Sequence, residues 1–209
     1  KSVTSIGESA FSDCTSLVIV NLPESIIQIG KSSFIRCSSL EILKVPNSLI
    51  SIEESTFYGC LSLKIVIGKK SLLTHIGARA FLGCQSIETI NIPESVNEIG
   101  DEVFWGCVKL NSIYAYSNMP VDISFSKDVF ASIDPSSDLN VNQSVCKLYV
   151  PCGAKKLYQL ANQWKDFVNI IEMPGLKVSS DSLEIASVAG SRATVELTID
   201  GTWTATSAQ

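Results

Sequence analysis

One nine-residue phrase returns five times along the chain and constrains its fold more than any other feature. It reads IGESAFSDC at residues 6–14 and returns as IGKSSFIRC, IEESTFYGC, IGARAFLGC and IGDEVFWGC. Its phenylalanines stand at positions 11, 34, 57, 81 and 104, so the period is 23 residues with a single step of 24. Such a period predicts stacked repeats, because one short unit cannot bury its own apolar side.

Each unit contains two apolar patterns that predict two kinds of element. Ala10, Cys14 and Leu17 follow one another at steps of four and three, which indicates a short helix, α or 3₁₀. Residues 17–23 (LVIVNLP) then alternate as a strand that ends at Pro23, because proline cannot donate to a strand ladder. The expected fold is an α/β solenoid with one short parallel strand and one short helix per repeat.

The repeats resemble the BspA-like leucine-rich repeats of bacterial surface proteins and some protist proteins. The run LxxVxLPxSIxxIGxxAFxxCxxL covers residues 17–40, with Ser33 in the alanine position. The likeness extends over residues 1–116, with Glu53 in place of one glycine and Ile87 in place of one leucine. The resemblance implies a leucine-rich-repeat solenoid and adhesion to host proteins or to other microbes.

The third junction, residues 65–77 (IVIGKKSLLTHIG), carries the one extra residue and lacks the proline found at positions 23, 46 and 93. We expect a local bulge there, with the strand register open by one residue. The repeat pattern fails after Ile113, and residues 117–147 indicate irregular loop around a degenerate last repeat through Ile123 and Phe130.

The C-terminal third predicts a cap and a separate tail. A short strand at 146–151 and a helix at 153–167, with Leu157, Leu160, Ala161 and Trp164 on one face, are expected to close the array. The LYVP-x-G run with the following aromatic residues resembles the C-terminal end of such arrays in Bacteroides-type surface proteins. The expected domains are the repeats (1–116), the degenerate last repeat with its strand-helix cap (117–173) and a β tail (174–209).

The tail resembles the start of a BACON-type immunoglobulin-like module. The pieces that carry this likeness are L-x-V-S at 176–179, S-L-x-I at 182–185, V-x-L-x-I at 195–199 and G-T-W-T at 201–204. The resemblance implies a partial, all-β, sandwich-like module of a family associated with glycan binding.

Composition excludes several classes of function. A net charge of −5, with no cluster of Lys and Arg, argues against a nucleic-acid partner. No apolar run reaches the length of a transmembrane segment. Because Lys1 aligns with Glu24 inside a repeat, the chain has the form of a fragment. An export signal, such as a lipoprotein signal that anchors the protein to a membrane, is therefore expected upstream.

Neither the cysteines nor the single histidine indicates a catalytic or metal site. The cysteines of the phrase are expected to be unpaired, small core residues, and there is no CxxC pair near a histidine. Cys146 and Cys152 flank one strand, and both the free and the disulfide-bonded states are left open. His75 occupies a variable column and is expected on the surface. We therefore expect no cofactor, no metal and no enzymatic activity.

The strand residues that point away from the core form the candidate binding surface. In a solenoid they line the concave face, the usual interaction surface. The predicted set is Ile19, Asn21, Ile42, Lys44, Ile65, Thr89, Asn91, Ser112 and Tyr114. The alternative is that the β-branched residues are there only for packing.

Two functional hypotheses follow. In the first, the protein is a non-enzymatic, secreted or cell-surface protein that uses this face to bind a protein or glycan on a host or microbial surface. In the alternative, the tail binds carbohydrate and the repeats act as a spacer.

Overall fold

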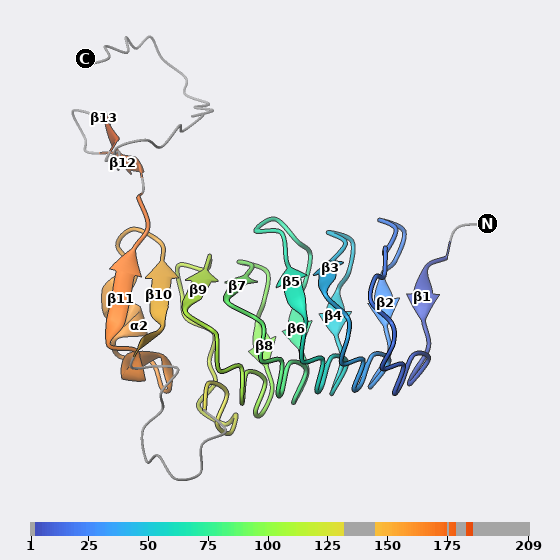
Figure 1. Ribbon diagram of the computed structural model, residues 1–209. Helices are drawn as coiled ribbons and strands as arrows, with labels where there is room; N and C mark the ends of the chain where they lie inside the picture. Colours follow the sequence, from blue (N-terminus) through green and yellow to red (C-terminus); the bar gives the residue numbers. More distant parts are fainter. Residues whose placement is uncertain (1–2, 132–144, 175, 179–182, 186–209) are drawn as a thin grey trace, which may run out of the picture.

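The computed structural model describes residues 3–131, 145–174, 176–178 and 183–185, and it has the form of a solenoid of parallel strands (Figure 1). The prediction of a repeat solenoid is confirmed. One row holds the longer strands β3 (Ile42–Lys44), β5 (Lys64–Val66), β7 (Thr89–Ile92), β9 (Ser112–Ala115), β10 (Lys147–Val150) and β11 (Asn169–Glu172). The other row holds β1 (Ser5–Ile6), β2 (Gln28–Ile29), β4 (Ser51–Ile52), β6 (His75–Ile76) and β8 (Glu98–Ile99).

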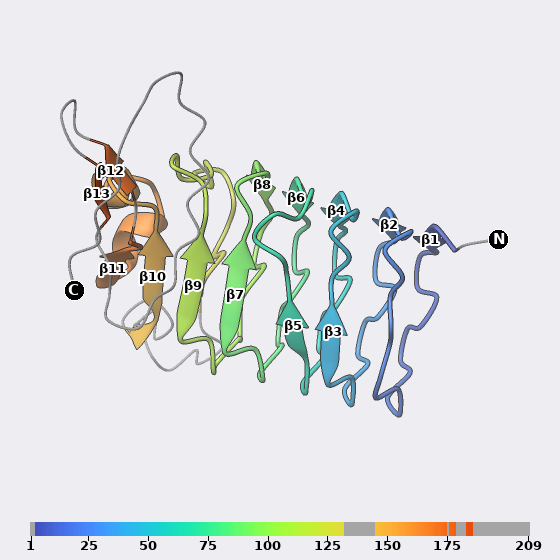
Figure 2. The ribbon, with the colours of Figure 1, turned by 90° about the horizontal axis from the view of Figure 1, so that it is seen from above.

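The two rows lie on opposite sides of the solenoid (Figure 2). The short strands pair in parallel in the order β1-β2-β4-β6-β8, and the isoleucines that end them come into register with one another. The long strands form two separate sheets, β3-β5 and β7-β9-β10-β11. Every named strand from β1 to β9 therefore has a paired neighbour one repeat away, and β10 and β11 continue the long-strand row beyond the repeated phrase.

The repeated phrase folds as tight turns rather than as the expected short helix. Within it, Ser12 N donates to Ser9 O and Cys14 N donates to Phe11 O, the hydrogen bonds of successive turns. Ser9 and Asp13 have φ angles of 54° and 58°, and the equivalent residues of the next four repeats are also left-handed. Two left-handed residues within five positions interrupt any right-handed helix. The apolar steps of four and three had suggested a helical face, but they arise from these turns.

Phenylalanine rings run through the core as a continuous stack. Centroids of successive rings, from Phe11 through Phe34, Phe57, Phe81 and Phe104 to Phe130, are 5.1 to 5.7 Å apart and nearly parallel. Phe130 thus adds a sixth ring beyond the last repeat of the phrase, and Ile123 is buried beside it. Offset stacking at this distance adds to the free energy gained from burying the rings.

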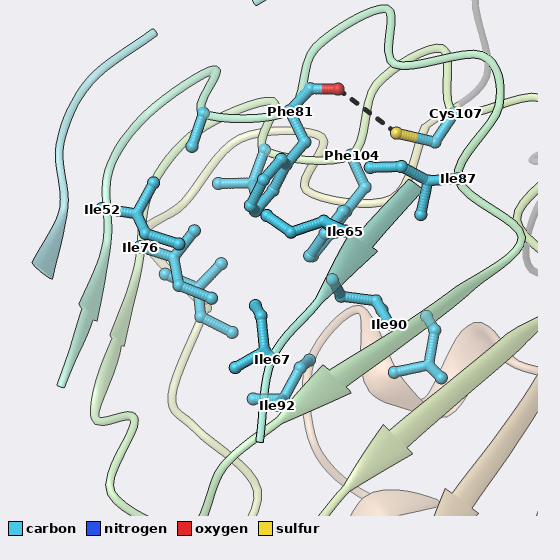
Figure 3. Close-up of a cluster of buried hydrophobic side chains, with 14 of the residues drawn as sticks. Ile52, Ile65, Ile67, Ile76, Phe81, Ile87, Ile90, Ile92, Phe104 and Cys107 are labelled. Atoms are coloured by element: carbon cyan, nitrogen blue, oxygen red, sulfur yellow. Dashed lines mark hydrogen bonds between the residues drawn. The ribbon is translucent and has the colours of Figure 1, made fainter. Parts of the chain in front are cut away.

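The third repeat shifts its strand register, and this corrects the position expected for Ile65. Ile65 is only 7% exposed, and Lys64 and Val66 point outward instead. Figure 3 shows Ile65 and Ile67 among the core side chains, beside Ile90 and Ile92. The alternative register would have buried Val66 alone. Burying two isoleucines in place of one valine removes more apolar surface from water, so the shifted register is favoured.

The same shift interrupts the long-strand row. Ile42 pairs with Lys64 and Thr89 pairs with Ser112, but among the described residues no strand ladder joins β5 to β7. The Asn91 side-chain amide donates to the backbone carbonyl of Ile67 at 2.8 Å and bridges the interruption. The short-strand row and the phenylalanine stack continue past this point without a break.

The C-terminal end is closed by a cap in which the single helix expected over 153–167 is divided. Its parts are α2 (Lys155–Tyr158) and the 3₁₀-helix η1 (Trp164–Asp166), and Gln163, with φ of 60°, breaks the helix between them. Trp164 is buried as expected, but Leu157 and Leu160 are exposed, and Tyr158 is buried instead. The Gln163 side chain bonds to Ile123 O and to Val129 N, which ties the cap to the preceding repeat.

Little of the tail lies within the described residues. β12 (Leu176–Val178) and β13 (Leu183–Ile185) form an antiparallel pair at the positions of the first two predicted strands. The V-x-L-x-I piece at 195–199 and the G-T-W-T piece at 201–204, and with them most of the BACON-like pattern, lie outside the described residues.

Candidate binding surface

The outward residues of the long strands form two parallel rows, which we call the long-strand face. Strand pairing fixes their order within two blocks, from the bridge between Ile19 and Ile42 to β5 and from β7 to β11, and repeat position aligns the two blocks. The first row is Ile19, Ile42, Lys64, Thr89, Ser112, Lys147 and Asn169, and the second is Asn21, Lys44, Val66, Asn91, Tyr114, Tyr149 and Ile171. Side chains on alternate strand positions project to one side, so each row is presented together.

Eight of the nine residues predicted for this surface lie on the long-strand face, and Ile65 does not. Ile19, Asn21, Ile42, Lys44 and Thr89 are exposed, whereas Asn91, Ser112 and Tyr114 are half-buried. Lys64 and Val66 take the place of Ile65, so the apolar column expected at Ile19, Ile42 and Ile65 stops after its second member.

Sequence reasoning missed the part of the face built by β10 and β11. Lys147 pairs with Ser112 and Tyr149 with Tyr114, and Asn169 and Ile171 follow on the next strand. The alternation of Lys147 and Tyr149 with the buried Leu148 and Val150 was a readable signal. The sequence did not reveal that β10 continues the face because a long segment separates β9 from β10. This segment breaks the fixed period by which the other strands could be aligned.

A pair of stacked tyrosines lies at the centre of this C-terminal part. The ring centroids of Tyr114 and Tyr149 are 4.5 Å apart with only 6° between the ring planes. Each ring restricts the side-chain rotamers of the other, so the pair is a rigid, partly apolar feature with two hydroxyl groups. Such amphipathic rings are enriched at the centres of protein interfaces.

The charged residues on the long-strand face are all lysines. Of these, Lys44 lies 3.9 Å from the carboxylate of Glu24, and both side chains are well exposed. Among the described residues, no ion pair involves Lys64 or Lys147. None of the outward positions named above is Asp or Glu.

The short-strand side is acidic by contrast. An open groove of about 500 Å³ runs along β6 and β8. Its charged lining is Lys31, Glu53, Glu54, His75, Glu98, Asp101 and Asp122. His75 Nδ1 lies 3.1 Å from a Glu98 carboxylate oxygen at the solvent boundary. Glu53 accepts a hydrogen bond from Ser51, and Asp101 accepts one from the backbone N–H of Lys127. His75 is therefore one member of a solvated acidic surface.

Four of the five cysteines of the phrase are core residues as expected, but Cys14, in the first repeat, is exposed. All cysteines with a described environment are free, including Cys146 and Cys152. Cys37, Cys60, Cys84 and Cys107 are buried, and each thiol donates to the backbone carbonyl of the phenylalanine one repeat earlier, at 3.0 to 3.3 Å. Figure 3 shows this contact between Cys107 and Phe81.

Burial keeps these thiols protonated. Desolvation raises the pKa of Cys60 and of Cys107 to about 12, and that of Cys37 to about 11. A nucleophilic or metal-binding cysteine needs a lowered pKa. Within the described ranges no group of His, Cys, Asp and Glu side chains could hold a metal ion. No helix in that part of the chain is long and apolar enough to cross a membrane.

Comparison with known proteins identifies the repeats. Residues 1–111, more than half of the chain, match the family model described as a BspA type leucine-rich repeat region, in six copies. No match to a curated protein is found.

Solved structures agree in fold. A Treponema pallidum (T. pallidum) leucine-rich repeat protein is 27% identical with a TM-score of 0.56, and the match covers 71% of this chain and 62% of that one. A leucine-rich cell surface protein from Faecalibacterium prausnitzii is 30% identical with a TM-score of 0.50, over 54% of this chain and 29% of that one. A leucine-rich repeat protein from Bacteroides ovatus, 23% identical with a TM-score of 0.51, covers 81% and 59%.

In each comparison the chain spans less than two thirds of the length of the solved protein. The matched family and these neighbours are described as repeat proteins, and none is described as an enzyme. The repeated phrase, the stacked core and the family match agree, and the chain belongs to the BspA-type leucine-rich repeat family.

Proposed function

We propose that the protein is a non-enzymatic, cell-surface interaction protein that binds another macromolecule through the long-strand face. The observation that carries the proposal is the exposure of large apolar side chains there. Ile19, Ile42 and Val66 are at least half exposed on strands whose opposite sides are buried in the core. An apolar patch with a polar rim on a rigid sheet is typical of an interaction site.

The rigidity of the support favours binding over a packing role for these residues. The inward neighbours Leu43, Val45 and Ile90 are almost completely buried, so the outward residues are not needed to fill the core. A preorganised surface loses little conformational entropy when a partner docks. The two tyrosines, fixed by their mutual stacking, add the kind of side chain that dominates binding energy at interfaces.

Placement at the cell surface draws its support from relatives. The family is that of BspA-type repeats, and one neighbour of 30% identity is described as a cell surface protein. Labelling of intact producing cells with an antibody raised against the long-strand face tests this part of the proposal. Signal that appears only after the cells are lysed would contradict it.

The binding test uses matched surface variants. We expect Ile42→Asp and Tyr114→Ala to weaken binding about tenfold in a screen of immobilised matrix proteins and bacterial surfaces, because a desolvated contact is lost. Ile50→Asp is the control: Ile50 is 50% exposed and Ile42 is 59% exposed, but Ile50 lies off this face. The thermal midpoints of Ile42→Asp and Ile50→Asp should stay close to that of the wild type, and that of Tyr114→Ala should fall by a few degrees because the stacking on Tyr149 is lost.

Two results would contradict the proposal. Equal loss of binding in Ile50→Asp would mean that the face is not specific. Glycan binding that survives deletion of residues 1–116 would favour the alternative, in which the tail recognises carbohydrate and the repeats act as a spacer.

A further inference from the structure

Charge is divided between the two sides of the solenoid. The long-strand face carries Lys44, Lys64 and Lys147, and none of its outward positions is acidic. The groove on the short-strand side is lined by Glu53, Glu54, Glu98, Asp101 and Asp122, with Lys31 as its one cation. Because the whole chain has a net charge of −5, a purely cationic face is not what its composition alone would produce.

The lysines differ in how far they are already neutralised. Lys44 has Glu24 at 3.9 Å, whereas no ion pair is formed by Lys64 or Lys147 among the described residues. Acidic residues lie at the edges of the face: Glu41 and Glu88 directly precede β3 and β7, and Glu88 lines the same hollow as Lys64. Glu172, at the end of β11, accepts hydrogen bonds from the backbone N–H groups of Gly153 and Lys155. Lys64 and Lys147 are thus the charges that a partner can pair.

We propose that the partner of the long-strand face is an acidic protein segment, lying across the strands with carboxylates at Lys64 and Lys147. This inference rests on the proposed function and adds the chemistry of its partner. In the row of the two lysines, Thr89 and Ser112 lie between them. Val66, Asn91 and the tyrosine pair lie beside them in the second row, where apolar side chains of the segment would cover Val66 and the rings. The aliphatic members of the face favour a polypeptide over an anionic glycan, because sugar hydroxyls gain nothing from covering isoleucine and valine.

The distance between Lys64 and Lys147 sets the spacing expected between the acidic residues of the partner segment. Lys64 lies on β5 and Lys147 on β10, three strands further along the solenoid. Paired strands are about 4.8 Å apart, and among the described residues β5 and β7 are adjacent without a ladder, so the distance is at least about 15 Å. An extended chain advances about 3.3 Å per residue, so acidic residues roughly five positions apart would reach both ammonium groups. The hydroxyls of Thr89 and Ser112 then lie along the intervening backbone.

The test measures the binding of the full chain to synthetic peptides and to heparin. The peptides are matched in length and apolar content and differ only in the number of glutamates. We expect affinity to rise with the number of glutamates and to fall with added salt. Lys64→Glu combined with Lys147→Glu should weaken the binding of the acidic peptide at least about tenfold. Lys127→Glu combined with Lys165→Glu changes the charge equally off this face, and it should leave affinity within about twofold.

Each outcome decides the inference. Heparin bound more tightly than every acidic peptide, with the same dependence on Lys64 and Lys147, would overturn the polypeptide assignment in favour of an anionic glycan. Affinity that does not depend on glutamate content or on the two lysines would overturn the inference as a whole. In that case, the proposed function would still stand if Ile42→Asp abolished binding to matrix proteins. If Ile42→Asp also left binding to matrix proteins unchanged, both the acidic-partner inference and the proposed function would be overturned.

Discussion

Ser33 shows how closely a single position in the repeat is constrained. It occupies the same repeat position as Ala10, Thr56, Ala80 and Val103, and like the last three it is completely buried. Its hydroxyl has no hydrogen-bond partner, whereas the Thr56 hydroxyl in the next repeat donates to Glu53 O at 2.7 Å. A buried hydroxyl without a partner costs about 1–3 kcal/mol, so Ser33 is a weak point in a column that otherwise favours small apolar residues.

Ser33→Ala should therefore raise the free energy of unfolding by about 1 kcal/mol, measured by chemical denaturation. Thr56→Val is the matched control, because it removes a hydroxyl that does have a partner, and it should lower stability by about 1 kcal/mol. Destabilisation by Ser33→Ala would mean that the hydroxyl has a role that the packing does not reveal.

Among the elements, the ladder of thiols makes the array sensitive to alkaline pH. The pKa of Cys60 and of Cys107 is raised by burial to about 12, from the ordinary value of 9.0 expected in the unfolded chain. A raised pKa means that the unfolded state releases its proton first as pH increases. The stabilising contribution is thus complete below pH 9 and is lost as pH rises from about 9 to about 12.

Cys60→Ala tests this dependence. The variant should be less stable than the wild type at neutral pH by about 1 kcal/mol, because it leaves a small cavity. Its stability should then fall less steeply above pH 9, by up to about 1.4 kcal/mol per pH unit for the one thiol removed. Equilibrium unfolding across this pH range measures both effects, and parallel curves for the two proteins would contradict the account.

The register of β5 gives a second prediction for an element. Ile65→Asp should lower the free energy of unfolding by at least about 3 kcal/mol, because it places a charge in the core. Val66→Asp, one residue further on, should change it by no more than about 0.5 kcal/mol, because Val66 is exposed. Thermal or chemical denaturation measures both effects. A larger loss of stability in Val66→Asp than in Ile65→Asp would mean that Val66, and not Ile65, is buried.

The sequence predicts the elements unevenly, and the reason is physical. Strands and core columns follow from the period, because five copies of one phrase repeat the same burial pattern. The prediction of a helix in the phrase was wrong because the spacing of apolar residues does not report the left-handed φ angles of Ser9 and Asp13. Ile65 was misplaced because residues 65–67 are all apolar, so either alternation fits the letters. Only packing, which buries Ile65 and Ile67 together, distinguishes the two.

For the whole molecule, the C-terminal cap decides where the array ends. Trp164 packs against Phe130, with ring centroids 5.0 Å apart, and its indole N–H donates to Val121 O. A solenoid is held by contacts between neighbours, so the end that lacks its cap opens first. The last phenylalanine of the stack is covered by this one side chain together with Phe167.

Trp164→Ala should cost about 3–5 kcal/mol and loosen the array from that end. Hydrogen exchange should lose protection first in β10 and β11, while β4 and β6 keep theirs. Leu160→Ala, which removes an exposed side chain from the same cap, should change neither stability nor exchange. Uniform loss of protection along the array would mean that it unfolds as one unit.

The missing ladder between β5 and β7 has a mechanical consequence. Bending that opens the long-strand side stretches backbone hydrogen bonds at the other junctions, whereas among the described residues the Asn91 side chain carries the hydrogen bond across this one. On the opposite side the short strands β4, β6 and β8 stay paired, so bending would pivot about them. The solenoid is therefore most compliant at residues 67–89. Each of the two long-strand sheets keeps its own ladder and stays stiff, so the angle between them can change at this junction without unfolding a repeat.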